Sequence, residues 1–162
     1  LVGSEMCIRD STNTMHKVAE EVAASVHVPL LHIADATFDA LQKRAIHRVG
    51  LLGTKYTMQQ DFIKGKLKKR GLEVLVPESE DMEMINSVIF NELCVGKILP
   101  ESKEKFLKVI EKLKAQGAEG VILGCTEIGL LIKQADTDLP VFDTTEIHAK
   151  AAVDFALASE SA

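Results

Sequence analysis

One residue of this chain, Cys125, has both the chemistry of a nucleophile and a position that suits it. It lies in the segment Gly-Cys-Thr-Glu-Ile-Gly at 124–129, directly after an apolar run at 120–123. That run predicts a buried strand, and residues 128–132 are typical of the first turns of a helix. On such a turn, backbone N–H dipoles lower the pKa of a thiol and attract anionic ligands. The pattern favours a catalytic thiol; the alternative is a small cysteine packed behind the strand.

A second polar group, Ser-Thr-Asn-Thr at 11–14, stands at the start of another predicted helix, at 13–26. Like the Cys125 segment, it pairs a small nucleophile-type residue with a polar helix start. Ser, Thr and Asn are also ordinary N-cap residues, so capping alone can explain the group.

Helices and strands alternate along the chain, as an α/β fold requires. Thr57 is expected to begin one helix as its N-cap, with Gln60 completing a capping box. The alternation indicates a parallel sheet covered on both faces, with ligands bound beyond the carboxyl ends of the strands. The predicted strands are at 29–33, 49–53, 72–76, 120–123 and 139–142, and the predicted helices are at 13–26, 37–45, 57–70, 101–116, 128–132 and 145–158, with one more marked by Ile85, Val88, Ile89 and Leu93.

Composition excludes several classes of function. The 162 residues suffice for one domain or two small lobes, and the net charge of −5 argues against a nucleic-acid partner. No apolar run approaches the length of a membrane span, so no membrane partner is expected. Three widely spaced cysteines suit a reduced, cytoplasmic protein without disulfides, and no Cys or His pair has zinc-ligand spacing.

Five segments, in order, resemble the aspartate/glutamate racemase family, and most of all the bacterial racemases of acidic amino acids. The resemblance runs from about residue 12 to the C-terminus. It implies an α/β fold of two pseudo-symmetric lobes, each a parallel sheet flanked by helices, with the active site in the cleft between them. Residues 12–45 with 144–162 would be the remainder of the first lobe, which is incomplete, and residues 46–143 the second lobe. The five segments are 12–19, 29–37, 52–57, 124–129 and 141–145.

The resemblance also implies a reaction, the racemisation of aspartate or glutamate without cofactor or metal. One thiolate removes the α-proton and a thiol on the opposite face returns one. Cys125 matches the second-lobe thiol, and Thr126 and Glu127 match the turn that contacts the substrate. The substrate-binding residues expected in the first lobe are Thr12, Asn13 and Thr14. We further expect a homodimer located in the cytoplasm.

The chain departs from the family at Ser11, where the family has its first cysteine. A serine hydroxyl is a far weaker acid than a thiol, so we expect this chain to racemise negligibly. Residues 1–10 do not resemble the family, and we expect residues 1–11 to be non-native and the native chain to be truncated there. The alternatives are an inactive protein that binds acidic ligands, or a related reaction such as hydantoin racemisation, maleate isomerisation or malonate decarboxylation.

Other polar residues have two interpretations each. His16, one turn into the first helix, could orient the first-lobe site, or it could cap or pack. The backbone N–H groups at Thr54, Tyr56 and Thr57 could cradle a carboxylate, although a capped loop explains them slightly better. His148, early in the last helix, is expected to be structural.

Overall fold

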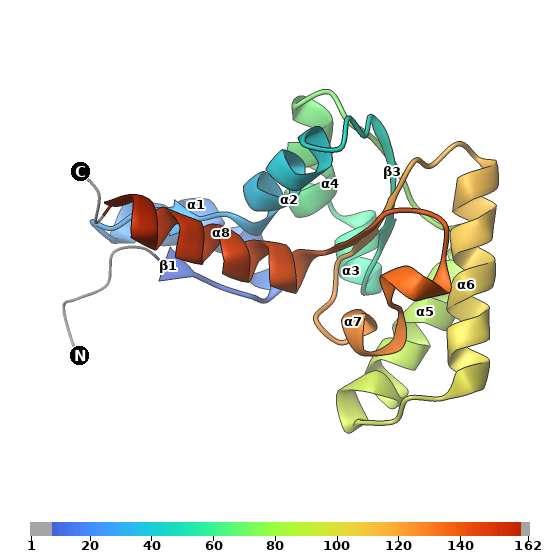
Figure 1. Ribbon diagram of the computed structural model, residues 1–162. Coiled ribbons are helices and arrows are strands. Elements are labelled where there is room, and N and C mark those ends of the chain that lie inside the picture. Colours follow the sequence, from blue (N-terminus) through green and yellow to red (C-terminus); the bar gives the residue numbers. More distant parts are fainter. Residues whose placement is uncertain (1–7, 160–162) are drawn as a thin grey trace.

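Four parallel strands form the main sheet of the computed structural model, which describes residues 8–159 (Figure 1). Gly50 of β3 lies opposite Val121 of β5, and Val121 lies opposite Val141 of β6. The predicted parallel sheet is confirmed. The strands run in the order β4-β3-β5-β6, with the bounds β3 Arg48–Leu52, β4 Glu73–Leu75, β5 Val121–Leu123 and β6 Val141–Asp143.

A second, two-stranded parallel sheet lies beside the first. It pairs β1, Ile8–Arg9, with β2, Leu30–Leu31. Figure 1 shows it near α1 and α8, at the end of the molecule away from α6. Of the segment predicted to be non-native, 1–11, residues 1–7 lie outside the described residues.

Helices cover both faces of the four-stranded sheet. On one face, α5 and α6 pack over Leu52, Val121 and Leu123; on the other, α2 and α4 pack over Leu51 and Ile122. Successive strand residues point to opposite faces, so both faces are buried. The helices are η1 Asn13–Val18, α1 Ala19–Ser25, α2 Ile33–Gln42, α3 Lys55–Gln59, α4 Asp61–Lys69, α5 Ser79–Asn91, η2 Leu93–Val95, α6 Pro100–Ala115, α7 Ile128–Leu131, η3 Gln134–Asp136 and α8 Thr144–Ser159.

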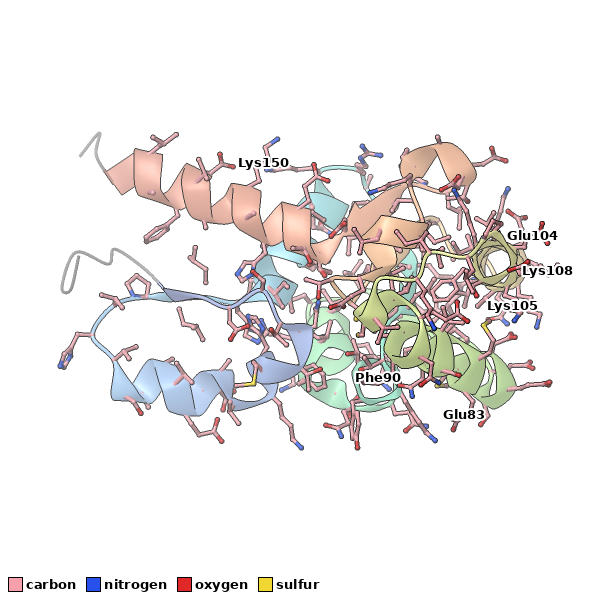
Figure 2. All side chains as sticks on the ribbon, turned by 90° about the horizontal axis from the view of Figure 1, so that it is seen from below. Glu83, Phe90, Glu104, Lys105, Lys108 and Lys150 are labelled. Atoms are coloured by element: carbon pink, nitrogen blue, oxygen red, sulfur yellow. The ribbon has the colours of Figure 1, made fainter. Side chains whose placement is uncertain are left out.

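The long helix α6 confirms its predicted amphipathic pattern. Pro100 occupies its first turn, where a missing N–H costs nothing. Its outer face carries charged side chains, among them Glu104, Lys105 and Lys108 (Figure 2). The buried face consists of Phe106, Val109, Ile110 and Leu113.

The helix predicted at 13–26 is divided in two. Residues 13–18 form the 3₁₀ helix η1, and the α-helix begins only at Ala19. Because a 3₁₀ helix has three residues per turn, Asn13 and His16 share its buried side. The apolar side chains of Met15 and Val18 are 52% and 38% exposed.

Two other predicted boundaries are wrong. The strand expected at 29–33 covers only β2, and α2 begins at Ile33 because the side chain of His32 caps it. Thr57 is not an N-cap. Thr54 caps α3 instead, its hydroxyl accepting from the N–H of Thr57, and the extended residue Gln60 separates α3 from α4.

The helix α2 packs against the four-stranded sheet. Its buried residues Ile33 and Leu41 share a core with Val49 and Phe142 of the four-stranded sheet. The same helix also packs along α8. Within residues 8–159, no helix has the length and apolar character needed to cross a membrane.

Candidate functional site

The carboxyl end of β5 leads directly into the turn that carries Cys125. Gly124 holds this turn close to β3, and its N–H donates to the carbonyl oxygen of Leu52 over 2.6 Å. A Cβ at Gly124 would lie 2.9 Å from that same oxygen, so no larger residue fits without displacing β3. The helix α7 follows at Ile128, which confirms the predicted strand-to-helix turn.

Cys125, Thr126 and Glu127 form one hydrogen-bonded group. The thiol of Cys125 and the hydroxyl of Thr126 both donate to Oε2 of Glu127, each over 2.9 Å. Cys125 and Glu127 are half-buried and Thr126 is exposed. The structure therefore brings these three predicted site residues together around one carboxylate.

The electrostatics of the thiol differ from the prediction. Burial, and after it the adjacent carboxylate of Glu127, raise the pKa of Cys125 to about 12. Burial also acts to raise the pKa of Glu127, but the hydrogen bonds from Cys125 and Thr126 outweigh it and lower that pKa. The predicted lowering of the thiol pKa is wrong, because α7 is too short to offset burial and a neighbouring negative charge. The group consists of a neutral thiol beside an ionised carboxylate.

Asn13 reaches this edge of the sheet through Thr144, which follows the last residue of β6. Nδ2 of Asn13 donates to the hydroxyl of Thr144 over 2.9 Å, and that hydroxyl donates to the carbonyl oxygen of Leu123 over 2.8 Å. Leu123 ends β5, two residues before Cys125. The three residues joined by these hydrogen bonds are all buried. It is the link between the segment at 12–14 and the strand that carries the thiol.

Sequence reasoning missed Thr144. The Asp-Thr-Thr sequence after the apolar strand residues was a usable signal, since polar residues at the carboxyl ends of parallel strands meet at one edge. Ser11 is half-buried, whereas Thr12 and Thr14 are exposed. Among residues 8–159, no hydrogen bond joins Ser11 or Thr14 to Cys125, Thr126 or Glu127.

The turn after β3 has little spare capacity to bind a carboxylate. The N–H of Lys55 donates to Oδ1 of Asn86 over 2.9 Å, and the N–H of Thr57 donates to Thr54. The side chain of Tyr56 is exposed, and Thr57 is buried. The capped-loop interpretation of this segment is the better one.

A cavity of about 630 Å³ lies elsewhere, between α2 and α8. Leu123, Gly129 and Asp143 line it, together with charged side chains of both signs. Cys125, Thr126 and Glu127 do not line it. Within the part of the chain that the structure describes, no three His, Cys, Asp or Glu side chains are grouped so as to hold a metal ion.

Comparisons with known proteins identify the family of this chain. Residues 10–152 match the Asp/Glu/hydantoin racemase family. The broad specificity amino-acid racemase RacX of Bacillus subtilis is 26% identical over 149 residues, which are 92% of this chain and 64% of that protein.

Solved structures resemble the whole described fold. A provisionally assigned Asp/Glu racemase from Yersinia pestis is 51% identical with a TM-score of 0.90, over 94% of this chain and 66% of that one. An aspartate racemase homologue from Pyrococcus horikoshii is 43% identical with a TM-score of 0.87, over 94% and 67%. This chain therefore spans about two thirds of the length of these relatives. By its sequence match and its fold, it belongs to the Asp/Glu/hydantoin racemase family.

Proposed function

We propose that this protein binds an acidic amino acid, aspartate or glutamate, and that Cys125 is the proton donor of a cofactor-independent racemase site whose second base is lacking at Ser11. The hydrogen bond between the Cys125 thiol and Glu127 at the carboxyl end of β5 carries the proposal. The family match supports a racemase reaction, and the names of the relatives above support amino-acid substrates.

The geometry suits Cys125 to the acid half of a two-base racemisation. Its sulfur carries the proton at rest, since both burial and Glu127 disfavour the thiolate. When the α-carbon of the substrate is a carbanion, an S–H bond breaks and a C–H bond forms, which leaves a thiolate. In the opposite direction this thiolate takes the α-proton back. Oε1 of Glu127 is not used by Cys125 or Thr126, so it can accept a hydrogen bond from the substrate ammonium.

The opposite face of the substrate needs a second base. We place Ser11 there, because it occupies the position of the first family cysteine. Its hydroxyl loses a proton far less readily than a thiol does. We therefore infer that this chain binds its ligand without measurable turnover. Asn13, tied to β5 through Thr144, supports a ligand contact by the segment at 12–14.

Two measurements test the proposal. Titration calorimetry with both enantiomers of aspartate and glutamate should show binding of at least one of them. Proton NMR in D₂O should show slow or no exchange of the α-hydrogen in this chain. Any exchange that does occur should vanish in Cys125→Ala and persist in the matched control Cys94→Ala, which removes an exposed thiol. Failure of all four ligands to bind, or exchange that survives Cys125→Ala, would overturn the proposal.

A further inference from the structure

Three imidazole rings meet where η1, α2 and α8 come together. The ring centroid of His16 lies 4.6 Å from that of His32 and 5.6 Å from that of His148. His16 and His148 are buried, and His32 is half-buried. Because the rings come from three elements that are distant in sequence, their hydrogen bonds help to hold those elements together.

His16 bonds to the backbone through both ring nitrogens. The amide nitrogen of Ile33 lies 3.1 Å from Nε2, and the carbonyl oxygen of Thr12 lies 3.1 Å from Nδ1. A backbone N–H can only donate, so Nε2 is the unprotonated acceptor and Nδ1 carries the hydrogen donated to Thr12. One neutral ring thus joins the residue before η1 to the first N–H of α2.

His32 and His148 complete the junction. Nδ1 of His32, the N-cap residue of α2, accepts from the N–H of Ala34 over 3.1 Å. Nε2 of His148 donates to the carbonyl oxygen of Leu31 over 2.7 Å, since a carbonyl can only accept. The first two N–H groups of α2 therefore both donate to imidazole nitrogens, and a protonated nitrogen cannot accept.

The charges near His32 disfavour a positive charge on that ring. Lys66 of α4 lies near His32 and pairs with Asp35 of α2 over 2.7 Å. Arg70 contacts the same carboxylate over 3.3 Å, so Asp35 is already shared by two cations. Burial, followed by Lys66, lowers the pKa of His32 to about 4.

The segment joined to α2 by His16 carries the proposed ligand contacts. The N–H of Thr12 donates to Oδ1 of Asp10 over 2.6 Å, while its carbonyl accepts from His16. Asn13 follows and donates to Thr144, and its buried Oδ1 has no hydrogen-bond partner among residues 8–159. The orientation of this amide therefore depends on how the backbone at Thr12 is held.

We propose that His16 is a positioning residue for the segment at 12–14, and that protonation of its Nε2 releases this segment from α2. The role rests on the proposed function, because the ligand contact at 12–14 is part of it. A proton from water binds Nε2, and the N–H of Ile33 loses its acceptor at the positive end of a helix. His16 acts through Thr12 and Asn13 and does not take part in proton transfer to the substrate.

Nitrogen-15 NMR of the unmodified protein tests the geometry without any substitution. Near neutral pH, the imidazole resonances of His16 should show hydrogen on Nδ1 and none on Nε2. The amide of Ile33 should be protected from exchange. On acidification, protonation of His16 and loss of Ile33 protection should share one midpoint, with exchange about tenfold faster than the intrinsic pH trend predicts, as loss of one hydrogen bond implies. Hydrogen on Nε2 near neutral pH, or protection that persists after protonation, would overturn the proposal.

The variant His16→Gln separates positioning from mere packing. Its amide oxygen can accept from Ile33 at any pH, so the acid-induced loss of protection should disappear while protection near neutral pH remains. His27→Gln and His47→Gln are matched controls, since both histidines are exposed, and they should keep the wild-type midpoint. If His16→Gln lost the protection of the Ile33 amide on acidification as the unmodified protein does, the positioning role of His16 would be contradicted. If His16→Gln does not fold, the tautomer and shared midpoint in the unmodified protein still decide the matter.

Calorimetry against pH, with L- and D-aspartate as the probes, distinguishes this proposal from the proposed function. Affinity should fall severalfold on acidification in the unmodified protein and less in His16→Gln. Equal pH dependence in both proteins would refute positioning and leave ligand binding intact. Absence of binding by any acidic amino acid would refute the proposed function, while the NMR result would still establish or refute the coupling of His16 to α2.

Discussion

The thiol of Cys125 donates a hydrogen bond to the carboxylate of Glu127 over 2.9 Å, with only Thr126 between them in the chain. The proton stays on sulfur, because burial and the neighbouring negative charge both disfavour a thiolate. The resting site is therefore arranged to give a proton, and a ligand with a positive ammonium group would make the thiolate easier to form.

Replacing Glu127 with Gln should make Cys125 more reactive. The substitution keeps the size of the side chain but removes the charge that opposes the thiolate. Alkylation of Cys125 by iodoacetamide should become up to about tenfold faster at a fixed pH, equivalent to about one pKa unit. Peptide mass spectrometry reads the rate at this cysteine alone. Glu104→Gln, on the exposed face of α6, should leave it unchanged, and a rate that does not rise in Glu127→Gln would contradict the prediction.

Replacing Ser11 with Cys should raise exchange of the α-hydrogen of an acidic amino acid. A second thiol would supply the base that the opposite face lacks. Proton NMR in D₂O should show a gain of about 100-fold or more, typical of a positioned base. The gain should be lost in the double variant Ser11→Cys with Cys125→Ala. Ser25→Cys adds a thiol on an exposed face of α1 and should have no effect. Equal gains from both single variants would contradict the assignment of Ser11.

Replacing Thr144 with Val should destabilise the fold. The hydroxyl accepts from Asn13 and donates to Leu123, so its loss leaves two buried polar groups without a partner. We expect a loss of about 2–4 kcal/mol in the free energy of unfolding, measured by urea denaturation. Thr144→Ser keeps the hydroxyl and should lose about 1 kcal/mol for the missing methyl group. Equal losses in the two variants would show that the hydrogen bonds are unimportant.

The stability of the protein should fall with acidification through His32. Its pKa is about 4 when folded and about 6.5 when unfolded, so the unfolded state takes up the proton first. The contribution of His32 is present above about pH 6.5 and is lost as the pH falls to about 4. His32→Asn keeps a capping acceptor that does not titrate. Its unfolding free energy should therefore fall less over this range. Parallel curves for the two proteins would contradict the prediction.

Much of the fold could be predicted from local pattern. The strands at 48–52 and 121–123 are short, mainly apolar runs between helices, and such runs are typical of a parallel sheet covered on both faces. The spacing of the apolar residues also predicted the buried faces of α5 and α6. The sequence did not predict where α2 and α3 begin, at Ile33 and after Thr54. Each start depends on which of several polar side chains reaches a free backbone N–H.

The position of Cys125 on its turn, and its grouping with Thr126 and Glu127, followed from the sequence by itself, because neighbours in a chain remain neighbours in any fold. Only the tertiary structure decided that the thiol is neutral, since its pKa depends on burial and on where one carboxylate points. Only the tertiary structure brought Asn13 into hydrogen-bond contact with Thr144, 131 residues away. It also brought the rings of His16, His32 and His148 together at the start of α2. Such contacts depend on distances that the order of residues does not contain.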